Sequence, residues 1–403
     1  MRLKIFTLIS ATLALLVAPS IGVPSNTLVE VQKFDGKIKE GSYIVKLKDN
    51  VSKSSHLGWL GKQLGSDKIT HSNWEKGLLH GFAGKFSEKT LSVLRSSPDV
   101  EYIAEDGIVT AFSVVTQTNA PWGIARLSQD ARLANQNSNA LNFTYRYESV
   151  AGAGADIYVV DTGVYTAHTE FGGRARWGAT FGGYPSADGN GHGTHIAATA
   201  AGARFGVAKQ ASIIAVKVLS DAGSGTISDI ISGLNFVASS AAASGRPTLV
   251  LLALGGGVSL ALDNAVNALI NSGIYVIVAA GGSATDVGNT SPARVPAAFT
   301  VGASSIADAV ASFSNYGPGL DIFAPGVGII SAWITSPTAT IAISGSSSSA
   351  AHVTGLLAYL ISRNPGATQA QIGALLNSLA LKNVLTGVPT GTKNYLARND
   401  IPG

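Results

Sequence analysis

A run of serines near the end of the chain has the features of a nucleophile site. Residues 343–355 read ISGSSSSAAHVTG, so small hydroxyl residues follow a glycine and lead into an apolar stretch at 356–361. This pattern predicts a helix N-terminus, where backbone N–H groups are free and the field is positive. A serine held there suits a reaction that creates an oxyanion, because backbone donors lie beside it. The simpler interpretation is a helix cap and a flexible turn, because serine is an ordinary N-cap residue.

Two side chains earlier in the chain could activate such a serine. Asp161 directly follows the predicted strand at residues 155–160 (ADIYVV), and His192 stands between two glycines in residues 188–195 (DGNGHGTH). An imidazole between a carboxylate and a hydroxyl can accept the hydroxyl proton, while the carboxylate orients the ring. Alone, each residue has an ordinary explanation, because aspartates often form turns at strand ends. Together, Asp161, His192 and Ser347 predict a hydrolase with a serine nucleophile.

The elements that would bring these residues together alternate between strands and helices. Runs that are for the most part continuously apolar predict strands at residues 155–160, 211–219, 249–254, 274–280 and 299–303, with helices at 227–242 and 261–271. This alternation predicts an α/β fold of three layers, in which helices cover both faces of a parallel sheet. Ligand sites in such sheets lie beyond the carboxyl ends of the strands, where we place Asp161 and the loops after Leu254 and Ala280.

A smaller unit precedes this sheet. From about Val29 to Ala111, strands predicted at 42–47, 77–86 and 100–105 alternate with helices predicted at 54–64 and 87–97. The pattern predicts a small α+β domain of a size that is marginally stable alone, so we expect it to lean on its neighbour. We place the boundary between about Ala111 and Thr118. The predicted segments are a leader at 1–20, a front domain at 21–115 and a main domain at 116–403.

The composition of the 403 residues excludes several classes of function. Cysteine is absent, which excludes disulfides, thiol nucleophiles and cysteine-ligated zinc. The net charge of +4 includes no basic run interleaved with aromatic residues, so we expect no nucleic-acid partner.

The first residues predict export from the cell. Residues 1–4 carry two basic side chains, residues 5–18 are apolar, and small residues follow, as in a secretory signal peptide. An uncleaved membrane anchor is the alternative, but the apolar stretch is short for a bilayer span, and we expect no membrane partner. Sequons at Asn50, Asn142 and Asn289 could carry glycans on this route.

The order of the three residues and the sequences around them resemble the subtilase family of serine proteases. Nucleophile-elbow hydrolases run serine, acid, histidine, and chymotrypsin-like proteases run histidine, aspartate, serine, whereas the order here is that of subtilisin. Residues 160–163 (VDTG), 191–195 (GHGTH) and 344–347 (SGSS) resemble the three signature blocks of the family. Residues 117–123 (QTNAPWG) and 312–317 (SFSNYG) are similar to its proteinase K branch.

The resemblance begins at about Gly41 and so includes the front domain. Residues 81–84 (GFAG) and 100–103 (VEYI) resemble the propeptide of these enzymes, which acts as chaperone and inhibitor and is then cut off. The resemblance therefore implies a zymogen that releases its front domain near Thr116. It also implies protein or peptide substrates, a monomer, and no cofactor for catalysis.

The resemblance further implies a role for each site residue. Ser347 would be the nucleophile, His192 the general base and then acid, and Asp161 the residue that orients the imidazole. His195 and His352 match non-catalytic histidines of the family blocks, so we expect them to have structural roles.

Two segments match the edges that pair with an extended peptide in the family. They are Gly223, Ser224 and Gly225, and Leu254, Gly255 and Gly256, where backbone bonds would provide affinity and pockets would provide preference. By the same resemblance, residues 256–257 and 279–281 would form the walls of an open apolar pocket. This implies broad specificity, with an apolar or aromatic residue before the scissile bond.

The chain departs from the family pattern around this chemistry. The family's oxyanion asparagine corresponds to Gly282, and loss of one such donor costs about 10²–10³ in turnover. The nucleophile block has Ser348 in place of Met and Ala351 in place of Pro, which removes packing behind the serine. The backbone N–H of Ser347 would remain as a donor, and Ser283 could partly substitute. We expect a slow peptidase; the alternative is an impaired pseudoprotease that binds peptides or inhibitors.

A structural calcium ion is implied by the proteinase K likeness. Its ligands would be the carboxylate of Asp321 and the backbone carbonyls of Pro296 and Ala298. One carboxylate is a thin ligand set for calcium, so the alternative is that Asp321 only ends a turn. Dinucleotide binding through residues 152–154 (GAG) is excluded, because those glycines precede the predicted strand instead of following it.

Overall fold

The structure is a computed structural model of the chain, and it describes residues 28–34, 38–72, 74, 77–109 and 113–401. The backbone divides between Ile108 and Val109 into two compact units, which are described separately. The predicted leader at residues 1–20 lies outside the described residues.

The smaller unit is a five-stranded sheet with two helices, in the order β1-β5-β2-β4-β3. Its strands are β1 (Val31–Gln32), β2 (Ile38–Leu47), β3 (Lys68–His71), β4 (Gly81–Lys85) and β5 (Val100–Gly107). The helices α1 (Lys53–Gly61) and α2 (Glu88–Ser96) begin after the serine caps Ser52 and Ser87. Val45, Phe82 and Leu94 lie in its core. This confirms the predicted small α+β domain.

The larger unit is built on a nine-stranded sheet in the order β17-β18-β14-β13-β12-β11-β8-β10-β9. The strand pairs are parallel except for β17 with β18. The strands are β8 (Asp156–Asp161), β9 (Ala175–Thr180), β10 (Ser212–Lys217), β11 (Thr248–Leu252), β12 (Tyr275–Ala279), β13 (Phe299–Ser304), β14 (Ile322–Pro325), β17 (Leu381–Lys382) and β18 (Tyr395–Leu396).

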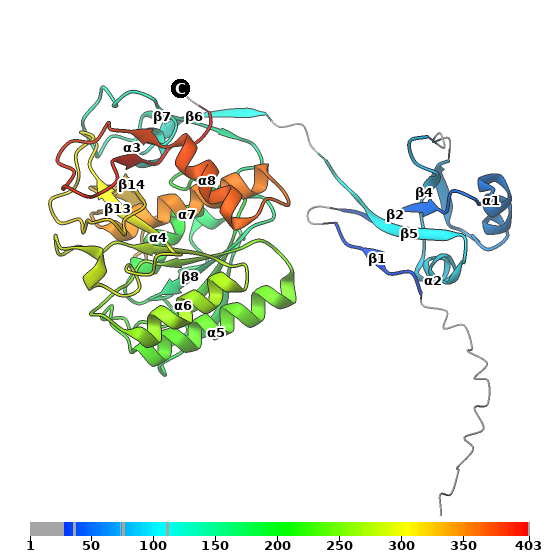
Figure 1. The fold of residues 1–403 in the computed structure, drawn as a ribbon, viewed down its shortest axis with the longest axis horizontal. Helices are drawn as coiled ribbons and strands as arrows, with labels where there is room; N and C mark the ends of the chain where they lie inside the picture. Colours follow the sequence, from blue (N-terminus) through cyan, green and yellow to red (C-terminus); the bar gives the residue numbers. More distant parts are fainter. Residues whose placement is uncertain (1–27, 35–37, 73, 75–76, 110–112, 402–403) are drawn as a thin grey trace, which may run out of the picture. The chain divides into compact units, whose positions relative to one another are not determined.

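Helices cover both faces of this sheet (Figure 1). On one face, α7 (Ser346–Arg363) packs against β11 to β14 and against α4 (His192–Ala201). On the other face, α5 (Ile227–Ser244) and α6 (Leu260–Asn271) lie side by side. Successive residues of β8 alternate between the two faces, so Ile157 and Tyr158 belong to different hydrophobic clusters. The three-layer prediction is therefore confirmed, and burial on both faces explains the continuously apolar strands.

The remaining elements surround this sandwich. They are α3 (Trp122–Arg126), α8 (Gln369–Leu379), the 3₁₀ helices η1 (Thr169–Phe171) and η2 (Val287–Asn289), and two antiparallel ribbons, β6 (Val114–Ala120) with β7 (Phe143–Glu148) and β15 (Ile329–Ala332) with β16 (Thr340–Ile343). β6 belongs to the larger unit, where its residue Thr116 pairs with Arg146 of β7.

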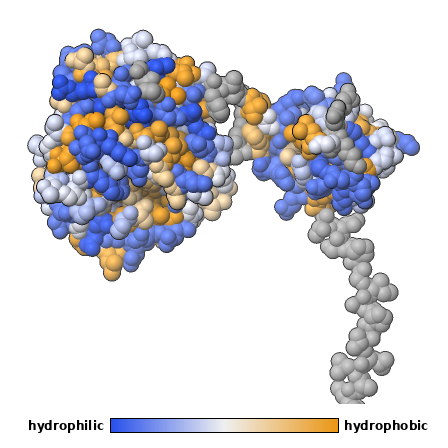
Figure 2. Space-filling model, turned by 45° about the horizontal axis from the view of Figure 1, so that its top comes forward, coloured by the Kyte–Doolittle hydropathy of each residue, from blue (hydrophilic) through white to orange (hydrophobic). Residues whose placement is uncertain are grey.

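The surface of the larger unit is mixed in character. Figure 2 shows hydrophilic and hydrophobic residues interspersed over the visible face of this unit. Within the described ranges, no helix combines the length and the apolar character needed to cross a bilayer.

Candidate active site

The predicted site residues gather at the carboxyl edge of the parallel sheet. Asp161 is the last residue of β8, and His192 is the first residue of α4. Ser347 is the second residue of α7, which begins beside the loops that follow β11 and β12. Residues separated by almost two hundred positions therefore meet at one edge, as expected for a parallel sheet with helices between its strands.

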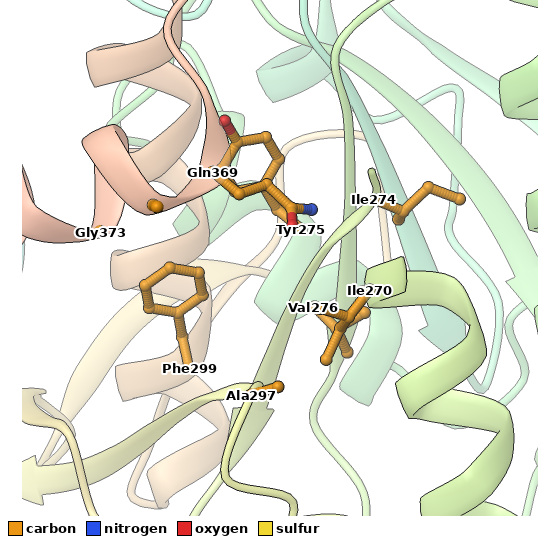
Figure 3. A pocket seen from close by; sticks show the side chains of 9 residues that line it. Ile270, Ile274, Tyr275, Val276, Ala297, Phe299, Gln369 and Gly373 are labelled. Atoms are coloured by element: carbon orange, nitrogen blue, oxygen red, sulfur yellow. The ribbon is translucent and has the colours of Figure 1, made fainter. Parts of the chain in front are cut away.

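A cavity lies at the opposite edge of the sheet. It has a volume of about 250 Å³ and is lined by Tyr275 and Phe299, the first residues of β12 and β13, and by Gln369 of α8 (Figure 3). None of the predicted catalytic residues lines it. The cavity therefore lies at the amino ends of the strands, whereas Asp161, His192 and Ser347 lie at the carboxyl ends.

Asp161 and His192 are in direct contact. Nδ1 of His192 lies 2.8 Å from Oδ1 of Asp161, and the same oxygen accepts the backbone N–H of Thr162 at 2.7 Å. Asp161 is fully buried, and its Oδ2 has no hydrogen-bond partner among the described residues. The carboxylate can accept but not donate, so the ring carries its proton on Nδ1 and presents Nε2 as the proton acceptor.

Burial and charge act in opposite directions on the imidazole of His192. Burial favours the neutral ring and lowers its pKa, whereas the charge and hydrogen bond of Asp161 and the charge of Asp188 raise it. The combined effect of the two carboxylates exceeds that of burial, so the pKa of His192 lies above its ordinary value of 6.5. A ring tuned in this way is a stronger base, which suits the removal of a proton from a hydroxyl.

Ser347 lies at the same edge, but its hydroxyl points elsewhere. Its Oγ donates to the backbone carbonyl of Ala253, 3.1 Å away, and no hydrogen bond joins it to His192 in the described part of the chain. Catalytic hydrogen bonds are often long or broken before substrate binds, so this geometry is compatible with a nucleophile. As the second helical residue, Ser347 has no helical acceptor for its backbone N–H, which is available to an oxyanion.

The loop that follows β12 is held by a buried amide. Asn315 donates from Nδ2 to the carbonyl of Ala280 at 2.8 Å and accepts the backbone N–H of Ser283 at 2.9 Å. Gly281 has a φ of 104°, and a Cβ there would lie 2.5 Å from Nδ2 of Asn315, so glycine is required. Its N–H donates to Oγ of Ser346 at 3.0 Å, which joins this loop to the start of α7.

Gly282 is under no such constraint. Its φ lies outside the left-handed region, and a Cβ there would meet a single neighbour within 4 Å, Cδ2 of Phe313 at 3.9 Å. Both the backbone and the surrounding space therefore accept a side chain at Gly282. Position 282 lacks a side-chain hydrogen-bond donor because its residue is glycine, although the packing leaves room for a larger residue.

The two predicted substrate segments flank Asp161. Residues 223–225 follow β10 and residues 254–256 follow β11, and these two strands are the neighbours of β8 in the sheet. Gly223, Ser224 and Gly225 are exposed. Gly256 is already paired in both directions with Ser291, through N···O distances of 3.0 and 3.2 Å.

His195 and His352 are buried behind the site. Nε2 of His195 is 2.9 Å from the carbonyl of Ile329, and Nδ1 of His352 is 3.0 Å from the carbonyl of Pro325. Burial lowers the pKa of each ring to about 4, so both are neutral near neutral pH. These contacts support structural roles for both.

The residues expected to bind calcium form a different contact. Oδ1 of Asp321 accepts a hydrogen bond from Nζ of Lys393 at 2.9 Å, and Oδ2 accepts the backbone N–H of Thr300 at 3.1 Å. Pro296 is exposed and Ala298 is buried. No group of three or more acidic or histidine side chains suited to a metal occurs in the part of the chain that the structure describes. The Asp321 carboxylate is therefore paired with Lys393, and a calcium ion at this site would have to displace that ammonium group.

The sequence analysis assigned no role to the buried side chains of Asp188, Lys217 and Asn315, which lie beside the site. Asp188 precedes His192 by four residues, and an acidic residue before a predicted helix is a capping signal that could have identified it. Lys217 ends an apolar strand and Asn315 lies in a loop, so neither had a local signal.

The chain is similar to known proteins over most of its length. Residues 152–398 match the model of the Subtilase family, and residues 42–112 match that of Peptidase inhibitor I9. It is 45% identical to a subtilisin-like serine protease, AsES, of Sarocladium strictum, with 91% of each chain covered. It is 42% identical to the alkaline serine protease ver112 of Corniculantispora psalliotae, with 99% of each covered.

Another relative and one solved structure extend this comparison. The chain is 40% identical to a cuticle-degrading protease of Metarhizium anisopliae, over 89% of each chain. The crystal structure of a cold adapted subtilisin-like serine proteinase matches with a TM-score of 0.63 and 43% identity. The match covers 70% of this chain and 98% of that one.

Proposed function

Because the chain belongs to the subtilase family of serine endopeptidases, we propose that it is a secreted zymogen that cleaves peptide bonds through Asp161, His192 and Ser347. The observation that carries this proposal is the contact of 2.8 Å between the buried carboxylate of Asp161 and the ring of His192. That contact sets the imidazole tautomer and raises its pKa at the sheet edge where Ser347 lies.

The proposed reaction requires the hydroxyl of Ser347 to change its hydrogen-bond partner. Oγ of Ser347 leaves the carbonyl of Ala253 and gives its proton to Nε2 of His192 as it attacks the scissile carbonyl carbon. The Asp161 carboxylate stabilises the imidazolium, which then protonates the leaving amine. In the second half of the reaction, His192 removes a proton from a water molecule as that water attacks the carbonyl carbon of the acyl-enzyme. The ester bond to Ser347 then breaks, His192 returns the proton to Oγ of Ser347, and the carboxylic acid product is released.

The oxyanion is the weak point of this mechanism. The backbone N–H of Ser347 supplies one donor, and Gly282 supplies no side-chain donor. Loss of one donor of this kind costs about 10²–10³ in turnover, and a triad with an incomplete oxyanion hole still accelerates hydrolysis strongly over water. We therefore propose a slow peptidase.

Broad, apolar substrate preference is part of the proposal. Next to the two substrate segments, Val258 is 56% exposed and Leu260 is 72% exposed, and Ile227 is also exposed. Apolar side chains on a peptide would cover these residues, while residues 223–225 and the part of residues 254–256 that is not paired with Ser291 would bond to its backbone.

A pseudoprotease is the second candidate function. It is favoured by the combination of Gly282 with a Ser347 hydroxyl that is bound to Ala253. In that case the same edge would hold a peptide or inhibitor without cutting it.

The proposal includes export and maturation as a monomer. The leader at residues 1–20 would direct secretion, and the front domain would inhibit the main domain until a cut near Thr116. Asn142 and Asn289 are exposed in the larger unit, as glycan acceptors must be.

For the ion site, we propose that Lys393 takes the place of calcium. Its ammonium lies 2.9 Å from the Asp321 carboxylate, so a calcium ion would have to displace it. A metal ion at this position would stabilise the fold and would take no part in catalysis.

Self-cleavage of the expressed precursor tests the function. We expect the full-length chain to release its front domain near Thr116 and the Ser347→Ala variant to remain whole, as followed by intact mass. A native chain that stays as intact as Ser347→Ala over the same period would favour the pseudoprotease.

A further inference from the structure

A second carboxylate lies behind the contact between Asp161 and His192. Asp188 is 9% exposed. Its Oδ1 accepts hydrogen bonds from Oγ1 of Thr162 at 2.9 Å and from the backbone N–H groups of Asn190 and Gly191 at 3.2 and 2.8 Å. Its Oδ2 accepts two from Thr194, the backbone N–H at 3.0 Å and the hydroxyl at 2.6 Å. One carboxylate thus takes five hydrogen bonds from two separate segments.

These two segments carry the two members of the catalytic pair. Thr162 follows Asp161 directly, and the contacts to Gly191 and Thr194 surround His192 at the start of α4. Oγ1 of Thr162 also accepts the backbone N–H of Gly193 at 3.0 Å. Asp188 therefore fastens the end of β8 to the start of α4 on either side of the bond between Asp161 and His192.

The network continues into the strand beside β8. Lys217 is fully buried, faces Asp161 in the strand register, and donates to the carbonyl of Thr162 at 2.6 Å and to Oδ1 of Asp221 at 2.8 Å. The backbone N–H of Gly189 donates to the same Asp221 oxygen at 3.2 Å. The chain of hydrogen bonds thus returns to the residue after Asp188. These hydrogen bonds surround the end of β8, where Asp161 lies. They also reach Asp221, two residues before the predicted substrate segment at 223–225.

We propose that Asp188 is a positioning residue for the hydrolysis, which holds the His192 ring against Asp161 and adds a second negative charge toward the imidazolium. This inference rests on the proposed function. A local turn would account for the bonds to Asn190 and Gly191, and a helix cap for those to Thr194. Neither would account for the bond to Thr162, which belongs to the Asp161 loop.

The charges around His192 support this role. Burial lowers the pKa of the ring, Asp161 raises it most strongly, and Asp188 raises it further. On its own helix, His195 is neutral near neutral pH, since burial lowers its pKa to about 4. Lys217 is paired with Asp221, and that hydrogen bond lowers the pKa of Asp221. Among the described residues, Asp161 and Asp188 are therefore the charges that favour the imidazolium.

The test follows the ring itself, so it does not depend on turnover. The full-length chain in the Ser347→Ala form is examined by proton NMR across pH, and the Nδ1–H resonance of His192 is assigned by its loss in His192→Ala. We expect Asp188→Asn to lower the titration midpoint of that resonance by about 0.5–1 pH unit. Asp263→Asn is the matched control, because Asp263 is 8% exposed and lies on α6; it should leave the midpoint unchanged.

A second variant separates position from charge. Thr162→Val keeps the Asp188 charge but removes the hydroxyl that joins the segments, so it should broaden or displace the resonance at constant pH, and Thr162→Ser should restore it. If the native chain also turns over, Asp188→Asn should lower kcat about tenfold with KM unchanged.

Two outcomes would overturn the inference. One is a folded Asp188→Asn chain whose midpoint equals that of the unaltered site; the other is a Thr162→Val resonance identical to that of the unaltered site. Failure of the proposed function would appear separately, as a precursor that never cleaves itself although its His192 resonance responds to Asp188→Asn.

Discussion

The hydroxyl of Ser347 donates to the backbone carbonyl of Ala253 across 3.1 Å. Ala253 directly precedes residues 254–256, the segment proposed to pair with a peptide. A substrate backbone laid along that segment competes for the same carbonyl oxygen, because each offers it an N–H or O–H donor. Substrate binding would therefore release the hydroxyl toward His192, which links peptide recognition to activation of the nucleophile.

Restoring the missing oxyanion donor should accelerate the enzyme. The backbone and the space around Gly282 accept a side chain, so we expect Gly282→Asn to raise kcat for a peptide anilide by about 10²-fold, through the donor it supplies. Gly282→Leu is the matched control, since it has a similar shape and no donor. Equal turnover by the Asn and Leu variants would remove the oxyanion argument.

The acid limb of the pH profile should reflect the raised pKa of His192. The base must be neutral, so kcat/KM should fall as pH drops through a pKa above 6.5. Asp161→Asn removes the charge and reverses the tautomer, so we expect a loss of about 10⁴-fold in kcat and an acid limb at lower pH. An acid limb that does not move in Asp161→Asn would exclude His192 as the titrating base.

Two buried histidines should make the larger unit sensitive to acid. The pKa values of His195 and His352 are lowered to about 4, so between about 4 and 6.5 the unfolded chain binds more protons. Stability is thus lost as pH falls through that window, by roughly 3 kcal/mol per histidine at most. His352→Asn should reduce the drop in melting temperature between pH 7 and 4.5. An unchanged drop would contradict the assignment.

Calcium should have little effect while Lys393 is present. Its ammonium neutralises Asp321, so we expect a chelator to leave the melting temperature of the Ser347→Ala precursor unchanged. In Lys393→Met the carboxylate is free, and added calcium should raise the melting temperature. If a chelator lowers the melting temperature of the precursor that retains Lys393, calcium displaces the Lys393 ammonium group.

Much of the fold was predictable, because burial leaves a direct pattern. The central strands read as apolar runs, and α5 begins at Ile227 as expected, where Thr226 caps it. The short strands β17 and β18 have two residues each, which is too few for a pattern. The ribbon of β6 and β7 depends on pairing between segments about thirty residues apart, and no local signal specifies such pairing.

Candidate residues for the site could be named from the sequence, but their contacts could not. Asp161 and His192 follow from sequence order, and the contact that their proposed roles require is present. The direction of the Ser347 hydroxyl depends on where β11 ends, which only the assembled sheet determines. The pairing of Asp321 with Lys393 spans 72 residues and likewise has no local signal.

Labelling with a fluorophosphonate probe reports whether Ser347 is activated, because the probe reacts with a serine whose proton a neighbouring base removes. Ser348→Ala serves as the control for the adjacent hydroxyls. The proposed triad predicts that the matured native chain and Ser348→Ala are labelled and that Ser347→Ala and His192→Ala are not. Labelling that persists in Ser347→Ala, or a native chain that takes up no probe, would contradict it.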